Sequence, residues 1–308
     1  MVFKVTENWN GKLLREYLRS ACRISRKTLC ILKKLDDGIL LNGVCVTVRA
    51  VLHTGDTVEL AIEDKNEDEN PNLYASGEMP PILYEDEAVL AINKPAGMPT
   101  HTSLGHYDDA LSNAVYSYLK EKNGSFVFRA INRLDAETSG IVLIAKNRYY
   151  AGILSNELAN GKFTKKYLAI VNGKTENGGS VEGYIAREQK SKIKRCFSSE
   201  PISDGDHSLS YYNTVSANEK ASLVLVTPIT GRTHQIRLHL ASLGHTIIGD
   251  TMYGEVSEYI SRQALHAYSL TFPSPIDGHN ITVTAPLSDD IVRLANEYSL
   301  EIKYQICN

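Results

Sequence analysis

Residues 129–140 read RAINRLDAETSG and place one aspartate, Asp135, between an arginine two positions earlier and a Thr-Ser-Gly turn. The apolar run GIVLIAK, which starts at Gly140, predicts a buried strand, so Asp135 lies in the loop that leads into it. An aspartate before such a turn usually accepts backbone hydrogen bonds. Two interpretations stay open at this point: a turn cap, or the reactive group of an enzyme.

Around this loop, residues 80–308 contain strands and helices that mix without regular alternation. KKYLAIVNG (165–173) and ASLVLVTPITG (221–231) predict strands, whereas DALSNAVYSYLKEK (109–122) and THQIRLHLASLG (233–244) predict helices. No glycine-rich phosphate-binding loop accompanies them. We therefore predict an α+β domain with a mixed, largely antiparallel central sheet and flanking helices.

A second cluster of polar residues lies at 231–254, GRTHQIRLHLASLGHTIIGDTMYG. His234 and His239 are five residues apart, which does not place them on one helical face, and no Glu or Cys completes a tetrahedral set, so we expect no metal. A serine nucleophile elbow is also missing. Arg237 could pair with Asp135 and hold it ionised and oriented, as a nucleophile requires. It could equally form an ion pair that only stabilises the fold.

The first 62 residues predict a separate small domain. Helical spacing of apolar residues begins at Leu13, Ser25 is placed as the N-cap of a second helix, and Asn42-Gly43 predicts a hairpin. The outer face of the second helix, which Asp37-Gly38 is expected to end, is basic. We take its cations as candidate RNA contacts, with a merely solvated face as the alternative: Arg26, Lys27, Lys33 and Lys34.

Charge is distributed unevenly along the 308 residues. The net charge is −3, which argues against a general nucleic-acid binder, but residues 1–62 carry ten basic and six acidic residues, a net of +4. Residues 63–78 hold six acidic residues and one lysine, a net of −5. We interpret residues 63–79 as an acidic, mobile linker between the domain at 1–62 and the domain at 80–308.

Other compositional features narrow the class of protein. No run of 18 apolar residues is present, which argues against a membrane span, and the first residues lack the pattern of a secretory signal. The five cysteines are scattered and never spaced as CxxC, so we expect neither a disulfide framework nor structural zinc, and a cytoplasmic location. No heptad seam is visible, and we expect a monomer.

Five motifs in order carry a resemblance to a known family. INKPAGMPTH, INRLDAETSGIVLIAKN, KKYLAIVNG, the 231–254 cluster and RQALHAYSLTF together resemble the RluA-type pseudouridine synthases over residues 81–287. The N-terminal helices and hairpin resemble the alpha-L RNA-binding module. The resemblance implies an enzyme that isomerises uridine to pseudouridine in structured RNA, with 23S ribosomal RNA as the first choice of substrate and transfer RNA as the second. It implies no cofactor.

The resemblance also implies roles for individual residues. Asp135 corresponds to the catalytic aspartate, and Arg133 to the arginine that helps displace the target nucleotide. Tyr167 corresponds to the tyrosine that stacks on the extruded base, and Arg237 to the arginine that pairs with the aspartate. These roles suit the chemistry, because a stacked uridine must leave the RNA helix before its base can be detached and rejoined through carbon. Whether the aspartate attacks the anomeric carbon or removes a ribose proton stays open.

The chain departs from the family pattern at three positions. Asn132 replaces a histidine that often precedes the arginine, Ala136 replaces a residue that is often basic, and Thr246 replaces a proline. Asparagine can still donate and accept hydrogen bonds, so we retain Asn132 as a candidate RNA contact. The loss of a basic residue at 136 removes one potential phosphate contact.

A basic stretch at 187–196, REQKSKIKRC, is a further candidate RNA-binding segment. Lys192, Lys194 and Arg195 are its predicted contacts, and a solvated loop is the alternative. Two other functions are kept beside the leading one. The first is a non-catalytic RNA-binding or ribosome-assembly protein on the same fold, and the second is a hydrolase of N-glycosidic bonds.

Overall fold

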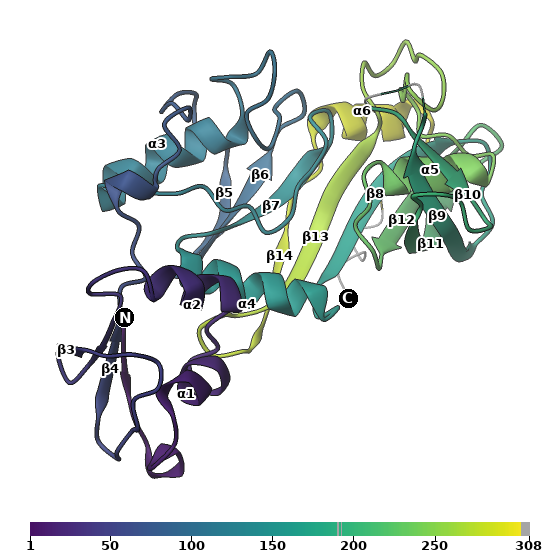
Figure 1. Cartoon of the computed structure of the whole chain (residues 1–308). Coiled ribbons are helices and arrows are strands. Elements are labelled where there is room, and N and C mark those ends of the chain that lie inside the picture. Colours follow the sequence, from purple (N-terminus) through teal and green to yellow (C-terminus); the bar gives the residue numbers. More distant parts are fainter. Residues whose placement is uncertain (190, 192, 303–308) are drawn as a thin grey trace.

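The computed structural model describes residues 1–189, 191 and 193–302, and its strands form two sheets (Figure 1). The smaller, N-terminal sheet has the strand order β1-β4-β2-β3, and its pairings are antiparallel. Its elements, together with the helices of this part of the chain, are β1 (Val2–Lys4), η1 (Glu7–Trp9), α1 (Leu14–Ser20), α2 (Arg26–Leu32), β2 (Ile39–Leu41), β3 (Val44–Cys45) and β4 (Thr57–Leu60).

The larger sheet has ten strands in the order β10-β9-β11-β12-β8-β13-β7-β6-β5, with β14 paired to β13. Among the described residues its pairings are antiparallel except that of β13 with β7, so the prediction of a mixed, largely antiparallel α+β fold is confirmed. The strands are β5 (Ile82–Glu85), β6 (Val89–Lys94), β7 (Ser139–Ala145), β8 (Thr164–Asn172), β9 (Gly178–Arg187), β10 (Arg195–Ser198), β11 (Asp206–Ala217), β12 (Ala221–Pro228), β13 (Leu265–Pro273) and β14 (Asn280–Thr284).

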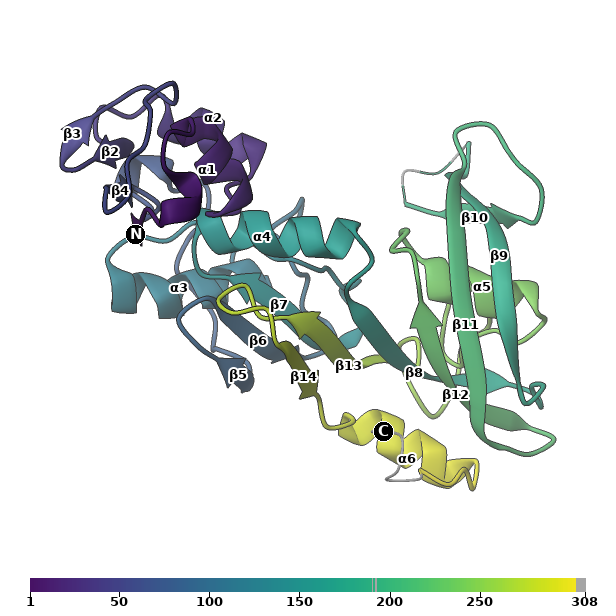
Figure 2. The same cartoon turned by 90° about the horizontal axis from the view of Figure 1, so that it is seen from below.

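Helices flank the larger sheet (Figures 1 and 2). Alternate residues of a strand point to opposite faces, and β7 is buried along its whole length, so both faces of the sheet are covered there. The helices are α3 (Leu111–Asn123), α4 (Arg148–Ala159), α5 (Gln235–Ser242) and α6 (Asp289–Glu297). Val142 belongs to the core on the α3 side, whereas Ile141 belongs to the core that includes α4 and the N-terminal module.

The N-terminal module rests on the larger domain through α2 and α4 (Figure 2). Ser25 caps α2, as predicted, because its hydroxyl accepts a hydrogen bond from the Thr28 N–H at 3.1 Å. The Thr28 hydroxyl then donates to the Arg148 carbonyl at 3.4 Å. At Gly152 an added Cβ would lie 3.0 Å from the Ser25 Cβ, so a larger residue there would force Ser25 at the start of α2 to shift by a few tenths of an ångström.

The acidic segment at 63–79, which includes η2 (Asn66–Asp68), was predicted to be mobile, and the structure instead ties it to the larger domain. Asp64 has a side chain only 3% exposed and lies 2.6 Å from Arg129. Glu69 lies 2.8 Å from Lys120. The carboxylates of this segment therefore neutralise cationic side chains of the larger domain. Composition alone could not reveal this, because the partners lie 51 and 65 residues away along the chain.

Within the part of the chain that the structure describes, no helix is both long enough and apolar enough to cross a membrane.

Two buried histidines predict how stability depends on pH. Burial lowers the pKa of His239 and His266 to about 4, from 6.5. Between these values the unfolded chain binds protons that the folded protein does not, so the free energy of unfolding falls as the pH decreases. Each histidine contributes a slope of at most about 1.4 kcal/mol per pH unit.

Urea denaturation at pH values between about 7 and 4.5 measures how steeply the free energy of unfolding depends on pH. We expect His239→Gln to reduce this slope, since one of the two imidazoles is then removed. An unchanged slope in that variant would contradict the assignment.

Candidate active site

The loop that carries Asp135 is held from both sides by buried polar groups. The Thr100 hydroxyl donates to the Leu134 carbonyl at 2.9 Å and accepts from the Leu134 N–H at 3.2 Å. On the other side of Asp135, the ammonium of Lys94 donates to the Ala136 carbonyl at 2.9 Å. The backbone is therefore fixed immediately before and immediately after the aspartate, which leaves its side chain a narrow choice of positions.

Lys94 holds this loop with a side chain that is fully buried. Its ammonium donates to the carbonyls of Pro95, Met98 and Ala136, at 2.8, 2.7 and 2.9 Å. Burial lowers the pKa of Lys94 to about 7, although the nearby Glu137 acts in the opposite direction. Lys94 stands in one of the motifs quoted from the sequence, but no role was predicted for it.

We predict that Lys94→Met destabilises the protein and misplaces Asp135. The variant leaves three carbonyls without their donor, and each unsatisfied buried group costs about 1–3 kcal/mol, less whatever water recovers. The melting temperature and the catalytic activity should both decrease. Lys174→Met is the matched control, because it removes an exposed surface ion pair with Glu219, which contributes little. A Lys94 variant that behaves like this control would contradict the prediction.

Asn132 is used in a different way from the one we expected. Its amide donates to the Ile141 carbonyl at 3.0 Å and accepts from the Leu143 N–H at 2.8 Å. The side chain thus replaces a strand partner along one edge of β7, which accounts for an asparagine at this position. Contact of Asn132 with RNA stays a prediction.

The carboxylate of Asp135 is 25% exposed and faces two cationic or potentially cationic groups. Arg237 donates from Nη1 to Oδ2 at 3.3 Å, and Nε2 of His234 lies 3.7 Å from the same oxygen. The hydrogen bond that the carboxylate accepts comes from this arginine, while the Thr138 N–H bonds to the Asp135 backbone carbonyl. Among the described residues, the Asp135 side chain therefore pairs with Arg237 and does not accept the Thr138 N–H of the turn.

Arg237 is shared with a second carboxylate. Its guanidinium forms a two-pronged pair with Asp250, with Nε to Oδ2 and Nη2 to Oδ1 both at 2.7 Å. Asp250 is 1% exposed and also accepts the Met252 and Tyr253 N–H groups. Burial acts to raise the pKa of Asp250, but Arg237 and these N–H groups hold it below its usual value. The stronger pair thus orients Arg237, and its remaining nitrogen reaches Asp135.

His234 is oriented by Tyr253. The tyrosine hydroxyl accepts from the Arg195 N–H at 2.8 Å and lies 2.9 Å from Nδ1 of His234. Burial lowers the pKa of His234, which favours the neutral ring. A hydroxyl that donates to Nδ1 then leaves the ring proton on Nε2, the nitrogen that faces Asp135. Sequence reasoning missed Asp250 and Tyr253 as members of the site, although both stand in the motif that marked Arg237.

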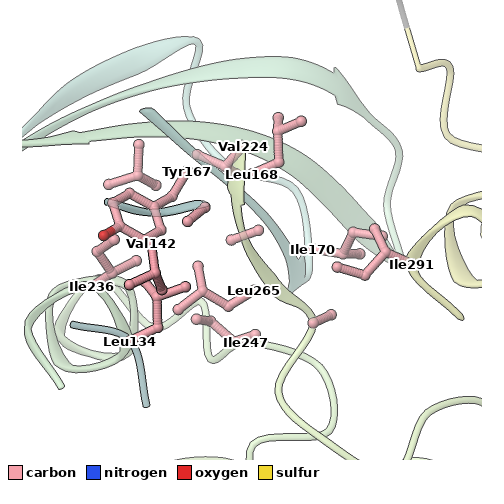
Figure 3. Packing of buried hydrophobic residues seen from close by; sticks show 14 of the residues in the cluster. Leu134, Val142, Tyr167, Leu168, Ile170, Val224, Ile236, Ile247, Leu265 and Ile291 are labelled. Carbon is pink, nitrogen blue, oxygen red and sulfur yellow. The ribbon is translucent and has the colours of Figure 1, made fainter. Parts of the chain in front are cut away.

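Tyr167 packs beside the aspartate at the edge of the core. Figure 3 shows its ring beside Val142 and Ile236, with the hydroxyl at the edge of the cluster. The side chain is 9% exposed, and burial raises the pKa of its hydroxyl, with the charge of Asp135 acting in the same direction. The ring is therefore fixed by packing on one side and faces a cavity on the other.

A cavity of about 360 Å³ unites the residues of the site. Such a volume lies at the lower end of the range for small-molecule sites, about 300–1,000 Å³. The structure brings Asp135, Tyr167 and Arg237 together on its wall, with the exposed Arg133 also lining it. The described residues contain no group of three or more side chains that could hold a metal ion.

Asn132 also lines the cavity, whereas the remaining candidates for RNA contact among the described residues are not part of its wall. Lys194 is exposed and lies 3.8 Å from Glu188, while the backbone of Arg195 bonds to Tyr253 at the site. Lys192 lies outside the described residues. The basic residues of the N-terminal module are exposed on α2 and in the turn that follows it: Arg26, Lys27, Lys33 and Lys34.

Comparisons with known proteins identify the family. Residues 88–242 match the family model described as RNA pseudouridylate synthase. The chain belongs to this family. It is 35% identical over 272 residues to "Uncharacterized RNA pseudouridine synthase YjbO" of Bacillus subtilis (strain 168), covering 88% of this chain and 94% of that one.

A second relative carries a more specific name. The chain is 33% identical over 225 residues to "Ribosomal large subunit pseudouridine synthase D" of Zymomonas mobilis, covering 68% of this chain and 70% of that one. The solved structure of "Human RNA Pseudouridylate Synthase Domain Containing 4" has the same fold, with a TM-score of 0.60, 24% identity, and coverage of 72% of this chain and 94% of that one. The RluA-type resemblance of the motifs is thereby confirmed, and the chain is an RNA pseudouridine synthase.

Proposed function

We propose that this pseudouridine synthase modifies uridines of 23S ribosomal RNA, with Asp135 as the catalytic carboxylate. The observation that carries the proposal is the position of that carboxylate, which is partly exposed on the wall of the cavity and lies 3.3 Å from Arg237. The name of the Zymomonas mobilis relative supports the choice of large-subunit RNA over transfer RNA.

The neighbours of Asp135 suit the steps that isomerisation requires. The bond from the ribose to N1 of uracil breaks, the base turns, and a bond from the ribose to carbon five forms. Carbon five releases its proton and N1 takes one up, so the product is an isomer of uridine. Arg237 orients the Asp135 carboxylate for the first step through the hydrogen bond from Nη1 to Oδ2. Tyr167 presents an aromatic face to the base while it is detached. The walls of the cavity restrain the base until the new bond forms.

Arg133 is suited to open the RNA before these steps. It is exposed at the cavity, whereas Leu134, the next residue, is buried and anchors the loop. A stacked uridine must leave its neighbours to reach Asp135, and a guanidinium can occupy the space that it vacates. We propose this role for Arg133.

Binding of the surrounding RNA falls to segments outside the cavity. We propose residues 1–62 as the RNA-binding module, 63–79 as the connection, and 80–308 as the catalytic domain. The exposed cations of α2 and the basic segment at 187–196 supply the charge that tracks a phosphate backbone. We also propose that Asn132 contacts RNA through the hydrogen-bonding groups of its side-chain amide that its bonds to β7 do not use.

Mapping of pseudouridine in cellular RNA tests the substrate. RNA from cells that lack the gene should have lost pseudouridine at one or a few positions of 23S ribosomal RNA. The wild-type gene should restore them, and Asp135→Asn should not. Loss confined to transfer RNA would overturn the choice of substrate, and no loss in any RNA would contradict the proposed function.

A further inference from the structure

Lys165 is a cation of the cavity that has no partner among the residues that the structure describes. Its side chain lines the cavity on the same strand, β8, as Tyr167. Residues two apart on a strand point to the same face, so the ammonium extends on the side where the base is expected. Neither a hydrogen bond nor an ion pair to a described residue satisfies it.

The architecture of the sheet leaves room for this side chain. The pairing of β12 with β8 ends where Val226 meets Tyr167, and β12 then leads into the turn that contains Gly231. Lys165 therefore lies beyond the last pair that β8 forms with β12. On the other side of β8, it pairs with Leu270 of β13. A Cβ added at Gly231 would lie 3.6 Å from the Lys165 ammonium, so the lysine ends against this turn.

An ammonium in this position is costly without an anion. Burial lowers the pKa of Lys165, and no carboxylate of the described residues offsets that effect. The other buried cation of the cavity, Arg237, is matched by two carboxylates, Asp250 and Asp135. An anion that approaches Lys165 must therefore come from outside the described part of the chain.

RNA supplies one kind of anion, the phosphodiester group. We propose that Lys165 binds a phosphodiester of the RNA next to the nucleotide that enters the cavity. In this arrangement the base reaches Tyr167 and Asp135 inside the cavity. The sugar–phosphate backbone of the RNA does not enter with the base, and one of its phosphates contacts Lys165. This inference rests on the proposed function, because it takes RNA as the ligand, and it adds a contact that fixes the sugar–phosphate part of the target.

Short oligouridylates test the contact without knowledge of the natural target. One oligomer carries ordinary phosphodiester linkages, and a second of the same length carries uncharged methylphosphonate linkages. Binding of both is measured for the wild type, Lys165→Gln and Lys165→Arg. The matched control is Lys166→Gln, because Lys166 points to the opposite face of β8 and is not among the described residues that line the cavity.

We expect Lys165→Gln to lose about tenfold in affinity for the phosphodiester oligomer, the scale of one charge-assisted hydrogen bond. It should lose nothing for the methylphosphonate oligomer. Its slope of log affinity against log salt should be smaller by about 0.7, the value for one phosphate contact on a single strand. Lys165→Arg should retain most of the affinity, and Lys166→Gln should resemble the wild type.

Equal losses on the two oligomers, or no loss on the phosphodiester oligomer, would overturn the proposal. Melting temperatures of the variants show whether an unfolded protein causes the loss, and Lys165→Arg provides a folded variant with the charge retained. Tritium release from uridine-labelled ribosomal RNA separates this inference from the proposed function. An active wild type with no lysine effect refutes the contact alone, whereas an inactive wild type refutes the function whatever the oligomers show.

Discussion

Asp135→Asn should abolish pseudouridine formation while RNA binding persists. Asparagine preserves the shape of the side chain but cannot act as a carboxylate toward the ribose. We expect a loss of at least about a thousandfold in turnover, within the range seen when an enzyme loses its nucleophile. Tritium release from carbon five of labelled uridine measures turnover, and filter binding with ribosomal RNA measures affinity.

Glu137→Gln is the matched control for this variant. Glu137 lies two residues along the same loop and is exposed, and it is not among the described residues that line the cavity. The control should retain most of the activity. An active Asp135→Asn protein would overturn the assignment of the catalytic carboxylate, and equal losses in the two variants would point to a general effect of charge on the loop.

Arg237→Met should strongly destabilise the protein. It leaves Asp250, which is 1% exposed, as a buried charge without its cation. Removing one partner of a buried pair typically costs about 3–5 kcal/mol. Chemical denaturation measures the loss, and the activity should fall as well, since Asp135 loses the same guanidinium.

The double variant Arg237→Met, Asp250→Leu separates the two effects. Replacing both members of a buried pair by apolar residues is often neutral for stability, so much of the lost stability should return. The activity should not return, because Asp135 still lacks its partner. A single Arg237→Met variant as stable as the wild type would contradict the structural role of the pair, and an active double variant would contradict its role beside Asp135.

Local sequence patterns predicted the strands and helices that surround the site. The buried strand after Gly140 is β7, and the helix predicted at 233–244 is α5. What local patterns could not predict is the insertion of β13 between β7 and β8, with a parallel pairing to β7. That pairing joins Ser139 to His266, 127 positions apart, and nothing in either strand's hydrophobic pattern specifies its neighbour.

The candidate residues of the site were easier to predict from the sequence than the contacts between them. Asp135, Tyr167 and Arg237, which three separate motifs marked, line one cavity, and their catalytic roles stay predictions. The pair between Arg237 and Asp250 was not predicted, because a turn aspartate has no local feature that marks it as buried. Asn132 was interpreted through its difference from the family, whereas its contacts with β7 are set by backbone geometry that a single sequence does not display.

The most direct test of uridine isomerisation at Asp135 is tritium release by the purified protein. Ribosomal RNA from cells that lack the gene, labelled with tritium at carbon five of uridine, is incubated with the wild-type enzyme without added cofactor. We predict release of tritium to water and one pseudouridine for each tritium released, with neither in the presence of Asp135→Asn. Retention of all label on 23S ribosomal RNA and transfer RNA, by a folded protein that binds both, would contradict this prediction.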